Sequence, residues 1–421
     1  MAACRKVDLL PDSTFSGKVI IIGAGAAGLY AGYILKSRGI DFTIIEASNR
    51  AGGRLDKKSD FADYPIDLGA QWLHGRDSIL GDLAKSTGTN ISKDNSDEVY
   101  WFNKKISSII PKDVEAILSP TDNVTDISFL EYAEQQGLGS EYKYIVEQLA
   151  GDSGADASDL SIKWNAVEEE DWNSGDSDFK FEASFFDLID KNITEEIKDS
   201  ILLNTPITKI NYSGNRVLMT DNLGKSYTGD KVIVTVPITI LQDKDINFEP
   251  ALPQSKIEAF NKIGMGAGMK VFLKFSSKFY NENIAGGEIC AAYADEVVGK
   301  IGSDNVLLAF VMGRQAEHLT SLGSDEAITN ALLAELDSMY AGQATSSFID
   351  AHVEDWTTKP FIKGAYSYSK VGIGNARSIA AKPIDNKLFF AGEAMNLNGH
   401  HQTVHGAIET GYRAVINILT D

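Results

Sequence analysis

Three glycines near the amino terminus place the strongest constraint on the fold of this chain. Gly23, Gly25 and Gly28 follow a short apolar run, residues 18–22, and precede a segment that predicts a helix. In this setting the first glycine permits a tight turn, the second lets backbone N–H groups approach a pyrophosphate, and the third lets helix and strand pack closely. A second apolar run ends at Glu46, where an acid can bind ribose hydroxyls. We therefore expect a Rossmann-type βαβ unit that binds a dinucleotide.

The glycine pattern does not by itself distinguish NAD from FAD, and the next segment bears on that choice. Residues Arg50 to Arg54 read RAGGR and follow Glu46 closely. Two glycines permit a second close approach of the backbone to a diphosphate, and an arginine guanidinium makes bidentate contacts to phosphate. A β-turn with a solvated arginine would use the same residues, so this stretch alone leaves both interpretations open.

Length and charge limit the classes of function. The chain has 421 residues, 43% of them hydrophobic, which is enough for two packed cores, so we expect two domains. The formal net charge of −20 is the opposite of what a phosphate backbone requires, and we expect no nucleic-acid partner. An acidic protein attracts cations such as an amine substrate, although acidity also serves solubility alone.

Cysteine usage and the missing targeting signals indicate a reducing compartment. The chain contains only Cys4 and Cys290, which gives neither a disulfide framework nor a cysteine cluster for a metal. The first residues lack the apolar core of a secretory signal, and no apolar run is long enough to span a membrane. We expect a cytoplasmic protein with no membrane partner and no metal site.

The remaining patterns predict an α/β fold, in which a Rossmann-type domain is interleaved with a mixed α+β substrate-binding domain. Residues 78–200 mix polar and apolar side chains in a helical manner, whereas strand-like runs resume at Ile207 and a closing helix is predicted at Val404–Leu419. The expected dinucleotide-binding segments are 1–77, 201–260 and 382–421, and the expected substrate-domain segments are 78–200, mostly helical, and 261–381.

Several further stretches follow the glycine turn in a fixed order: IIEASNRAGGR, DLGAQWLHG, VIVTVP, MGAGMKVFLKF, WTTKPFIKGAYSYS, and FFAGEA before TVHGAIETGYRA. This succession resembles the flavin-containing amine oxidases, a family that includes monoamine oxidases, polyamine oxidases and flavin-dependent histone lysine demethylases. The resemblance covers the chain to about Gly75 and most of its second half, but barely extends into residues 78–200. It implies an FAD cofactor and the oxidation of a carbon–nitrogen bond in a small amine.

The resemblance also implies the residues that contact FAD. Gly392 and Glu393 match a segment near the ribityl chain, and the helix that begins at Thr403 and Val404 faces the isoalloxazine, where a positive helix end stabilises a reduced anion. Ile207 matches a backbone contact to adenine. The complete expected set is Gly23, Gly25, Ala27, Gly28, Glu46, Ala47, Gly53, Arg54, Gly69, Ala70, Gln71, Trp72, Ile207, Gly392, Glu393, Thr403 and Val404.

The same resemblance implies residues on the substrate side. Lys270 matches the lysine that holds a water against flavin N5, although a strand lysine could equally point to solvent. Trp356 and Tyr366 match an aromatic pair that lines the cavity, where aromatic faces attract an ammonium, and core packing is the alternative. His74 matches a position beside the substrate nitrogen, where imidazole could accept the amine proton; the alternative is a surface turn. Trp72 and Thr403 complete the expected substrate contacts.

Two of the following segments depart from the family pattern, and the third is an acidic run with two interpretations. Ala365 occupies the position where monoamine oxidases attach FAD through a cysteine, so we expect non-covalent FAD. His400 and His401 lie in an unusual loop and are interpreted as exposed residues rather than as flavin or substrate contacts. The acidic run Glu168–Asp171 is interpreted as a solvated face, and the binding of a distal ammonium is the alternative.

Together these features predict the FAD-dependent oxidation of a small amine, with a polyamine favoured, to an imine that hydrolyses while O2 is reduced to H2O2. Monoamine or amino-acid oxidation is the alternative within the class, and a flavin desaturase or a non-catalytic flavin-binding module is the alternative outside it. Amino-acid oxidases tend to carry a Met-Arg pair where Gln71 and Trp72 stand. Histone demethylation is disfavoured because the chain shows no basic surface. The expected partners are the amine and O2, and the oligomeric state is left open.

Overall fold

The glycine turn connects the central strand of a parallel sheet to the first helix. In this computed structural model, which describes residues 11, 13–120 and 124–420, β1 (Val19–Ile22) lies in the middle of the order β10-β2-β1-β14-β23. All neighbouring strands run parallel to one another. The other four strands are β2 (Phe42–Ile45), β10 (Ile201–Leu202), β14 (Lys231–Val234) and β23 (Leu388–Phe390). The predicted Rossmann-type sheet is confirmed.

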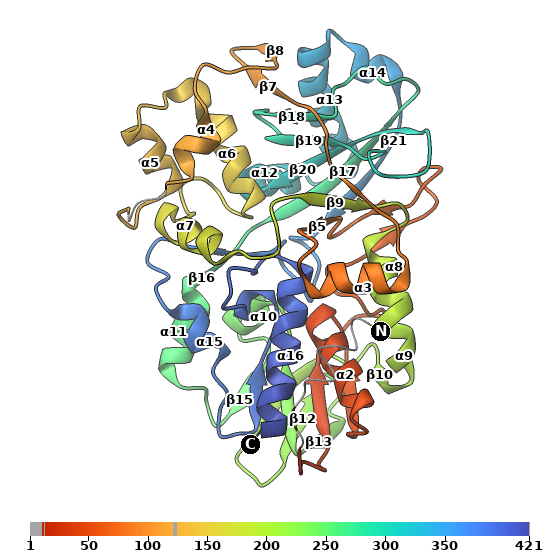
Figure 1. Ribbon diagram of the computed structural model, residues 1–421, viewed down its shortest axis with the longest axis vertical. Helices are drawn as coiled ribbons and strands as arrows, with labels where there is room; N and C mark the ends of the chain where they lie inside the picture. Colours follow the sequence, from red (N-terminus) through yellow and green to blue (C-terminus); the bar gives the residue numbers. More distant parts are fainter. Residues whose placement is uncertain (1–10, 12, 121–123, 421) are drawn as a thin grey trace.

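Two long helices from opposite ends of the chain cover one face of this sheet. Helix α2 (Ala26–Ser37) and helix α16 (Val404–Thr420) lie side by side in the lower half of the molecule (Figure 1). They approach so closely that a Cβ at Gly411 would meet the Ala27 carbonyl oxygen at 2.2 Å. The close contact places the start of the first helix against the middle of the predicted closing helix.

The opposite face of the parallel sheet packs against a smaller sheet and three helices. The smaller sheet has the order β13-β12-β11-β15, and a shared apolar core joins both layers. Its strands are β11 (Ile207–Asn211), β12 (Val217–Asp221), β13 (Ser226–Gly229) and β15 (Asn247–Glu249). The helices are α10 (Ile238–Gln242), α11 (Gln254–Lys262) and α15 (Ala376–Ala381).

A second lobe, in the upper half of Figure 1, is built on a seven-stranded sheet with the order β21-β17-β20-β19-β18-β7-β8. Its central strands are long and buried, which suits a sheet covered by helices. The strands are β7 (Glu98–Phe102), β8 (Lys105–Ser107), β17 (Gly268–Phe275), β18 (Asn283–Ala285), β19 (Ala292–Asp295), β20 (Asn305–Met312) and β21 (Phe348–Asp355). Helices α12 (Gly313–Ser321), α13 (Asp325–Tyr340) and α14 (Gln343–Ser347) accompany it.

Residues 78–200 are less uniformly helical than their pattern predicts. They contain β7 and β8, and also β6 (Ile91–Lys93) and β9 (Asp178–Phe181), which pair with β5 (Trp72–His74) in the order β5-β9-β6. Such short strands carry too few alternations to be distinguished from helix by periodicity. The helices here are α3 (Ile79–Thr87), α4 (Val114–Leu118), α5 (Phe129–Gln135), α6 (Lys143–Asp152), α7 (Ile162–Asp171), α8 (Phe185–Ile189) and α9 (Glu195–Ile197).

None of the helices in the described part of the chain is both long and apolar enough to cross a membrane. Cys290 is a buried free cysteine, and Cys4 lies outside the described residues.

A buried lysine connects α11 to the end of α15 and generates a test of this packing. Lys256 Nζ donates to the carbonyl oxygens of Ile379, Ala380 and Lys382 at 3.2, 2.7 and 2.6 Å. Because Lys256→Met leaves these carbonyls without their donor, we expect it to lower the free energy of unfolding by about 1–3 kcal/mol. Urea denaturation measures this loss, and Lys262→Met, at an exposed position of α11, is the control.

The same site predicts a pH dependence. Burial lowers the pKa of Lys256 to about 7, so above that pH the unfolded chain binds a proton that the folded protein does not. The free energy of unfolding of wild type, compared with that of Lys256→Met, therefore rises between about pH 7 and about pH 10.4, the ordinary pKa of lysine. Equal denaturation midpoints for Lys256→Met and Lys262→Met would contradict this description of the buried amine.

Candidate active site

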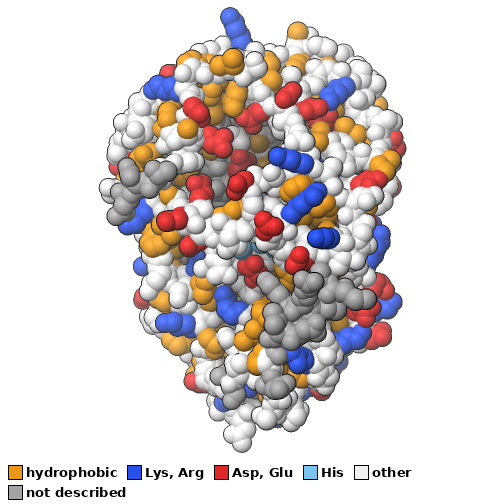
Figure 2. Space-filling model, in the orientation of Figure 1, with side chains coloured by type: hydrophobic (Ala, Val, Ile, Leu, Met, Phe, Trp, Pro, Cys, Tyr) orange, Lys and Arg blue, Asp and Glu red, His pale blue; other side chains and the backbone are white. Residues whose placement is uncertain are grey.

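A cavity of about 1910 Å³ lies between the two lobes and is lined by residues of both. Its volume exceeds the few hundred to about 1000 Å³ of ordinary ligand pockets and leaves room for a dinucleotide together with a substrate. Figure 2 shows acidic side chains gathered around a hollow in the upper half of one face. The cavity wall begins at the glycine turn and continues past Lys270 to acidic residues of the upper lobe.

The glycine turn leaves the backbone open to this cavity at the amino end of α2. Gly23 has a φ of +108°, and a Cβ at Gly28 would meet the Gly23 carbonyl oxygen at 2.0 Å, so neither position accepts a side chain. A Cβ at Gly25 would meet nothing within 4 Å. Gly25 also forms a bridge with Gly52 of the second glycine loop. Two backbone loops and a helix N-terminus thus form a cradle that fits a pyrophosphate.

Glu46 lies beside this cradle, at the end of β2. Its carboxylate accepts hydrogen bonds from Ala24 N at 2.7 Å and Ser48 N at 2.8 Å, which fix its orientation. Ala47 and Ile207 also line the cavity. Ala47 follows Glu46 in the chain, and Ile207 begins β11 of the adjoining smaller sheet. An oriented carboxylate with an apolar neighbour suits the ribose and base of a nucleotide.

A buried carboxylate, Glu393, organises the wall opposite the first helix. Glu393 Oε1 lies 3.0 Å from Arg54 Nη1, and Oε2 accepts from Ser367 Oγ at 2.7 Å and from Gln402 N at 3.0 Å. Burial favours the neutral acid, but Arg54, Ser367 and Arg377 together hold the pKa of Glu393 below its ordinary value. Two residues predicted to bind the cofactor, Arg54 and Glu393, therefore contact each other directly.

Lys270 points from β17 into the cavity and is almost fully buried. Its Nζ donates to the carbonyl oxygens of Asp67 and Gly69 at 2.9 and 2.6 Å and to the side-chain oxygen of Gln71. Burial lowers its pKa to about 8, partly offset by nearby Glu296. The structure thus places Lys270 beside Gly69 and Gln71, and gives it a pKa at which it can hold or release a proton near neutrality.

The predicted aromatic residues also line the cavity, held by hydrogen bonds to backbone. Trp356 Nε1 donates to the Leu68 carbonyl oxygen at 2.8 Å, and the Tyr366 hydroxyl donates to the carbonyl oxygen of Asp152 at 3.1 Å. Trp72 Nε1 donates to Asp94 at 3.0 Å. These side chains are therefore both packed and cavity-facing.

His74 occupies a more open part of the wall. Its Nδ1 lies 2.8 Å from Asp178, and the two side chains are 43% and 51% exposed. Thr403 and Val404, at the start of α16, line the cavity on the side of Glu393, together with Gly392. All the predicted site residues except Gly28, which packs against the Gly23 carbonyl oxygen, thus line one cavity, with His74 at a more solvated part of its wall.

A set of acids, here called the acidic cluster, lies on the upper wall, and sequence reasoning had singled out only one of its members, Glu169 of the acidic run. Burial raises the pKa of Asp152 to about 8, assisted by Glu98 and Asp178, and burial also raises the pKa of Glu98 and Glu169. The cluster consists of Asp94, Glu98, Asp152, Glu169, Asp176 and Asp178. Its members are dispersed along the chain, so only the fold reveals that they meet.

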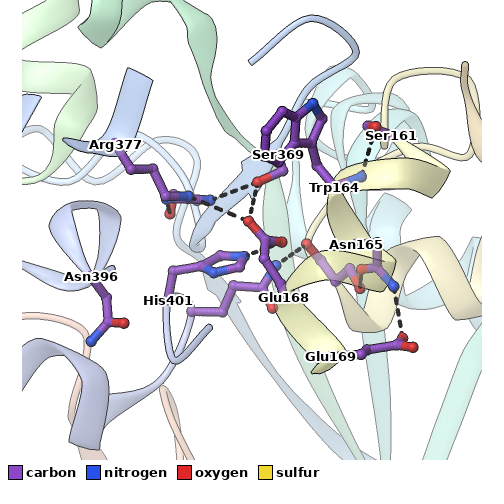
Figure 3. Close-up of polar contacts among 12 residues, drawn as sticks. Ser161, Trp164, Asn165, Glu168, Glu169, Ser369, Arg377, Asn396 and His401 are labelled. Carbon is purple, nitrogen blue, oxygen red and sulfur yellow. Dashed lines mark hydrogen bonds and ion pairs between the residues drawn. The ribbon is translucent and has the colours of Figure 1, made fainter. Parts of the chain in front are cut away.

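One sequence-based interpretation is wrong, and a second is wrong for one residue. His400 and His401 are only 2% and 5% exposed, because their loop packs against α7 rather than extending into solvent. Within the acidic run, Glu168 is not on a solvated face: Figure 3 shows it between His401, Arg377 and Ser369. The following acids, Glu169 to Asp171, are exposed.

Comparisons with known proteins agree with this geometry. The model of a family described as flavin containing amine oxidoreductase matches residues 26–187 and 183–419. Lysine-specific histone demethylase 2 of Homo sapiens is 27% identical over 97% of this chain and 54% of its own length, so the chain spans about half of that relative. Probable polyamine oxidase 4 of Arabidopsis thaliana is 28% identical over 97% of this chain and 90% of its own length.

Two solved structures share the fold. Putrescine oxidase bound to putrescine superposes with a TM-score of 0.80 at 19% identity, covering 97% of this chain and 100% of that one. Cyclohexylamine oxidase from Brevibacterium oxydans IH-35A gives a TM-score of 0.79 at 20% identity, covering 97% of this chain and 99% of that one.

The glycine cradle predicts that one substitution impairs cofactor binding and that another impairs folding. At Gly25 the backbone is extended and a side chain would enter empty space, so Gly25→Val should fold normally but block the approach of the diphosphate. Gly28→Ala should instead impair folding, because its Cβ would overlap the Gly23 carbonyl oxygen. Circular dichroism and the flavin absorbance of the purified protein measure the two effects.

Gly214→Ala, at an exposed position with ordinary contact distances, is the control and should match wild type in both measurements. Normal flavin content in Gly25→Val would show that the cradle does not hold the diphosphate.

Proposed function

Because the chain belongs to the flavin-containing amine oxidoreductase family, we propose that it oxidises a small diamine or polyamine. The cofactor is FAD. The proposal rests on one observation above the others: the acidic cluster lines the same cavity as the nucleotide cradle and Lys270. A substrate that carries a second ammonium would have its distal charge met by carboxylates, whereas a monoamine would leave them without a partner. Two of the similar proteins are named for polyamine or putrescine oxidation.

The residues present fit FAD. The backbone at Gly25 and the second glycine loop would hold the pyrophosphate, Glu46 the ribose, and the wall at Glu393 and Thr403 the remaining part. When bound, FAD supplies the two-electron oxidation of the carbon beside the amine nitrogen and passes the electrons to O2, which yields H2O2. Ala365 lines the cavity where a cysteine would be needed for attachment, which supports non-covalent binding.

The protein's own residues bind, orient and desolvate the amine. Trp356 and Tyr366 provide two aromatic side chains that line the cavity and are fixed by their hydrogen bonds, so they restrict the positions open to the substrate. A neutral amine is required for oxidation, and an ammonium arriving in a water-poor channel must give its proton to a nearby base. To hold a water molecule beside the reacting carbon for hydrolysis of the imine, Lys270 would exchange one of its three partners, the carbonyl oxygens of residues 67 and 69 and the Gln71 side chain, for that water.

The proposed substrate class predicts the outcome of anaerobic mixing with an amine panel. We expect 1,4-diaminobutane, spermidine or spermine to bleach the flavin absorbance at least about tenfold more efficiently than benzylamine, tyramine or leucine, since one paired ammonium contributes about 1.5–3 kcal/mol. Stopped-flow spectroscopy measures this, and readmission of air should restore the colour with release of H2O2. Preference for a monoamine would contradict the polyamine assignment.

The acidic cluster predicts how the apparent affinity depends on pH. Because burial raises the pKa of Asp152 to about 8, its carboxylate forms only as pH rises through that value. Diamine affinity should therefore increase from about pH 7 to pH 9, while diamines keep their charge until about pH 10. We expect Asp152→Asn to remove this increase, measured as the substrate concentration for half-maximal flavin reduction. Glu141→Gln, at an exposed position before α6, is the control, and an unchanged profile in Asp152→Asn would contradict the role of Asp152.

A further inference from the structure

A second histidine–carboxylate pair lines the cavity and is far better shielded from water than His74 and Asp178. His401 Nε2 lies 3.1 Å from Glu168 Oε2, and their side chains are only 5% and 17% exposed. Both residues line the cavity itself. Of the two pairs, this one therefore provides the imidazole in the less solvated part of the site.

Glu168 fixes the orientation and the tautomer of His401. Ser369 Oγ donates to Glu168, and Arg377 Nε lies 3.6 Å from its Oε1 (Figure 3). Burial opposes ionisation, but His401, Arg377 and Ser369 hold the pKa of Glu168 below its ordinary value. An ionised carboxylate only accepts hydrogen bonds, so in the neutral ring the proton resides on His401 Nε2.

That tautomer leaves a lone pair on the other ring nitrogen. Within the described part of the chain, His401 Nδ1 has no hydrogen-bond partner, whereas the neighbouring His400 uses its Nδ1 to contact Glu409 at 3.0 Å. A carboxylate that orients one nitrogen and leaves the other as a free acceptor is the arrangement that activates histidine as a base.

The backbone next to His401 connects the substrate side to the cofactor side. Gln402 N donates to Glu393 Oε2 at 3.0 Å, and Gln402 Nε2 donates to the Ser153 carbonyl oxygen at 2.6 Å. Thr403 follows directly and begins the wall expected to face the flavin. A Cβ at Gly399 would meet the Glu168 carbonyl oxygen at 2.5 Å, so this loop is packed tightly onto α7. His401 is thus held where both parts of the cavity meet.

We propose that His401 is the base that removes the proton from the substrate ammonium, and that Glu168 is the positioning residue that orients it. This inference rests on the proposed function, because it requires an amine substrate. In the step, one N–H bond of the ammonium breaks, the proton moves to His401 Nδ1, and the substrate nitrogen keeps the electron pair. The proton returns to water after the product leaves. Sequence comparison had placed this role at His74.

Carboxyl groups outnumber arginines around His401. The negative Glu168 and Glu393 are matched by the positive Arg377 and Arg54, and Glu169 and Asp152 add further carboxyl groups. The charged and titratable groups that contact His401 or Glu168, or share their part of the cavity, are Glu168 and Glu169 of α7, Asp152 of α6, Arg377 of α15, Arg54 of the second glycine loop, and Glu393 of η4 (Glu393–Met395).

His401→Gln in the FAD-loaded enzyme tests the proposal. With saturating 1,4-diaminobutane, we expect the anaerobic rate of flavin reduction near neutral pH to fall about 100-fold, the usual contribution of a positioned base. The difference in rate between wild type and His401→Gln should shrink towards about pH 10, where the amine loses its proton in solution and needs no protein base. A structural role alone would lower the rate equally at every pH.

Glu168→Gln is the second variant, and it leaves the histidine in place. Loss of the adjacent negative charge disfavours the imidazolium, so we expect the midpoint of the pH profile to move to lower pH by about 1–3 pH units. Glu170→Gln, two residues further along α7 and exposed, should keep the wild-type profile. Flavin absorbance shows that each variant still binds the cofactor.

Three outcomes would overturn the proposal: a wild-type rate in His401→Gln, a loss that does not depend on pH, or an unshifted profile in Glu168→Gln. A pH-dependent loss in His74→Gln with a wild-type His401→Gln would assign the base to His74 instead. If no amine reduces the wild-type flavin, the proposed function fails and this inference fails with it, a result distinct from the three above.

Discussion

The buried carboxylate of Glu393 is the interaction on which the architecture of the site depends. It contacts Arg54 from the second glycine loop, Ser367 from β22 (Ser367–Ser369), and the backbone N–H of Gln402 before the last helix. These segments are distant in sequence, and each contributes one wall of the cavity. Removal of one partner from such a buried ion pair typically costs about 3–5 kcal/mol, so the walls are coupled energetically as well as spatially.

The cavity that results has two chemically different ends. At one end, exposed backbone N–H groups and a helix N-terminus favour a diphosphate; at the other, the acidic cluster favours cations. Lys270 and His401 both line the cavity: Lys270 Nζ is held by three oxygen partners, whereas His401 is oriented through Nε2 and its Nδ1 has no partner among the described residues. A dinucleotide and a multiply charged amine can therefore occupy one continuous space without competing for the same contacts.

Local patterns predicted the fold well, because the features involved are local. The glycine turn between β1 and α2 was predicted from spacing alone, and the closing helix predicted at Val404–Leu419 corresponds to α16 (Val404–Thr420). Short strands such as Asp178–Phe181 could not be predicted, since their pairing partners rather than their periodicity determine them. The family resemblance supplied Lys270, Trp356 and Tyr366, which the structure brings to one cavity.

What the sequence could not reveal is which polar residues meet across the fold. Glu168 and His401 are each recognisable as titratable, but their pairing depends on the loop before α16 packing against α7. His401 was interpreted as exposed because it lies in an unusual loop; the loop is present, but both of its histidines are buried. The acidic cluster as a whole was not predicted for the same reason, since its members lie on different elements.

A crystal structure of the FAD-loaded enzyme with 1,4-diaminobutane bound under anaerobic conditions would test the central claim most directly. We predict that the diphosphate lies against Gly25, that one amine nitrogen lies within hydrogen-bonding distance of His401 Nδ1, and that the other lies among the acidic cluster around Asp152. A diamine whose reacting nitrogen lies beside His74, or whose distal nitrogen contacts no carboxylate, would contradict it.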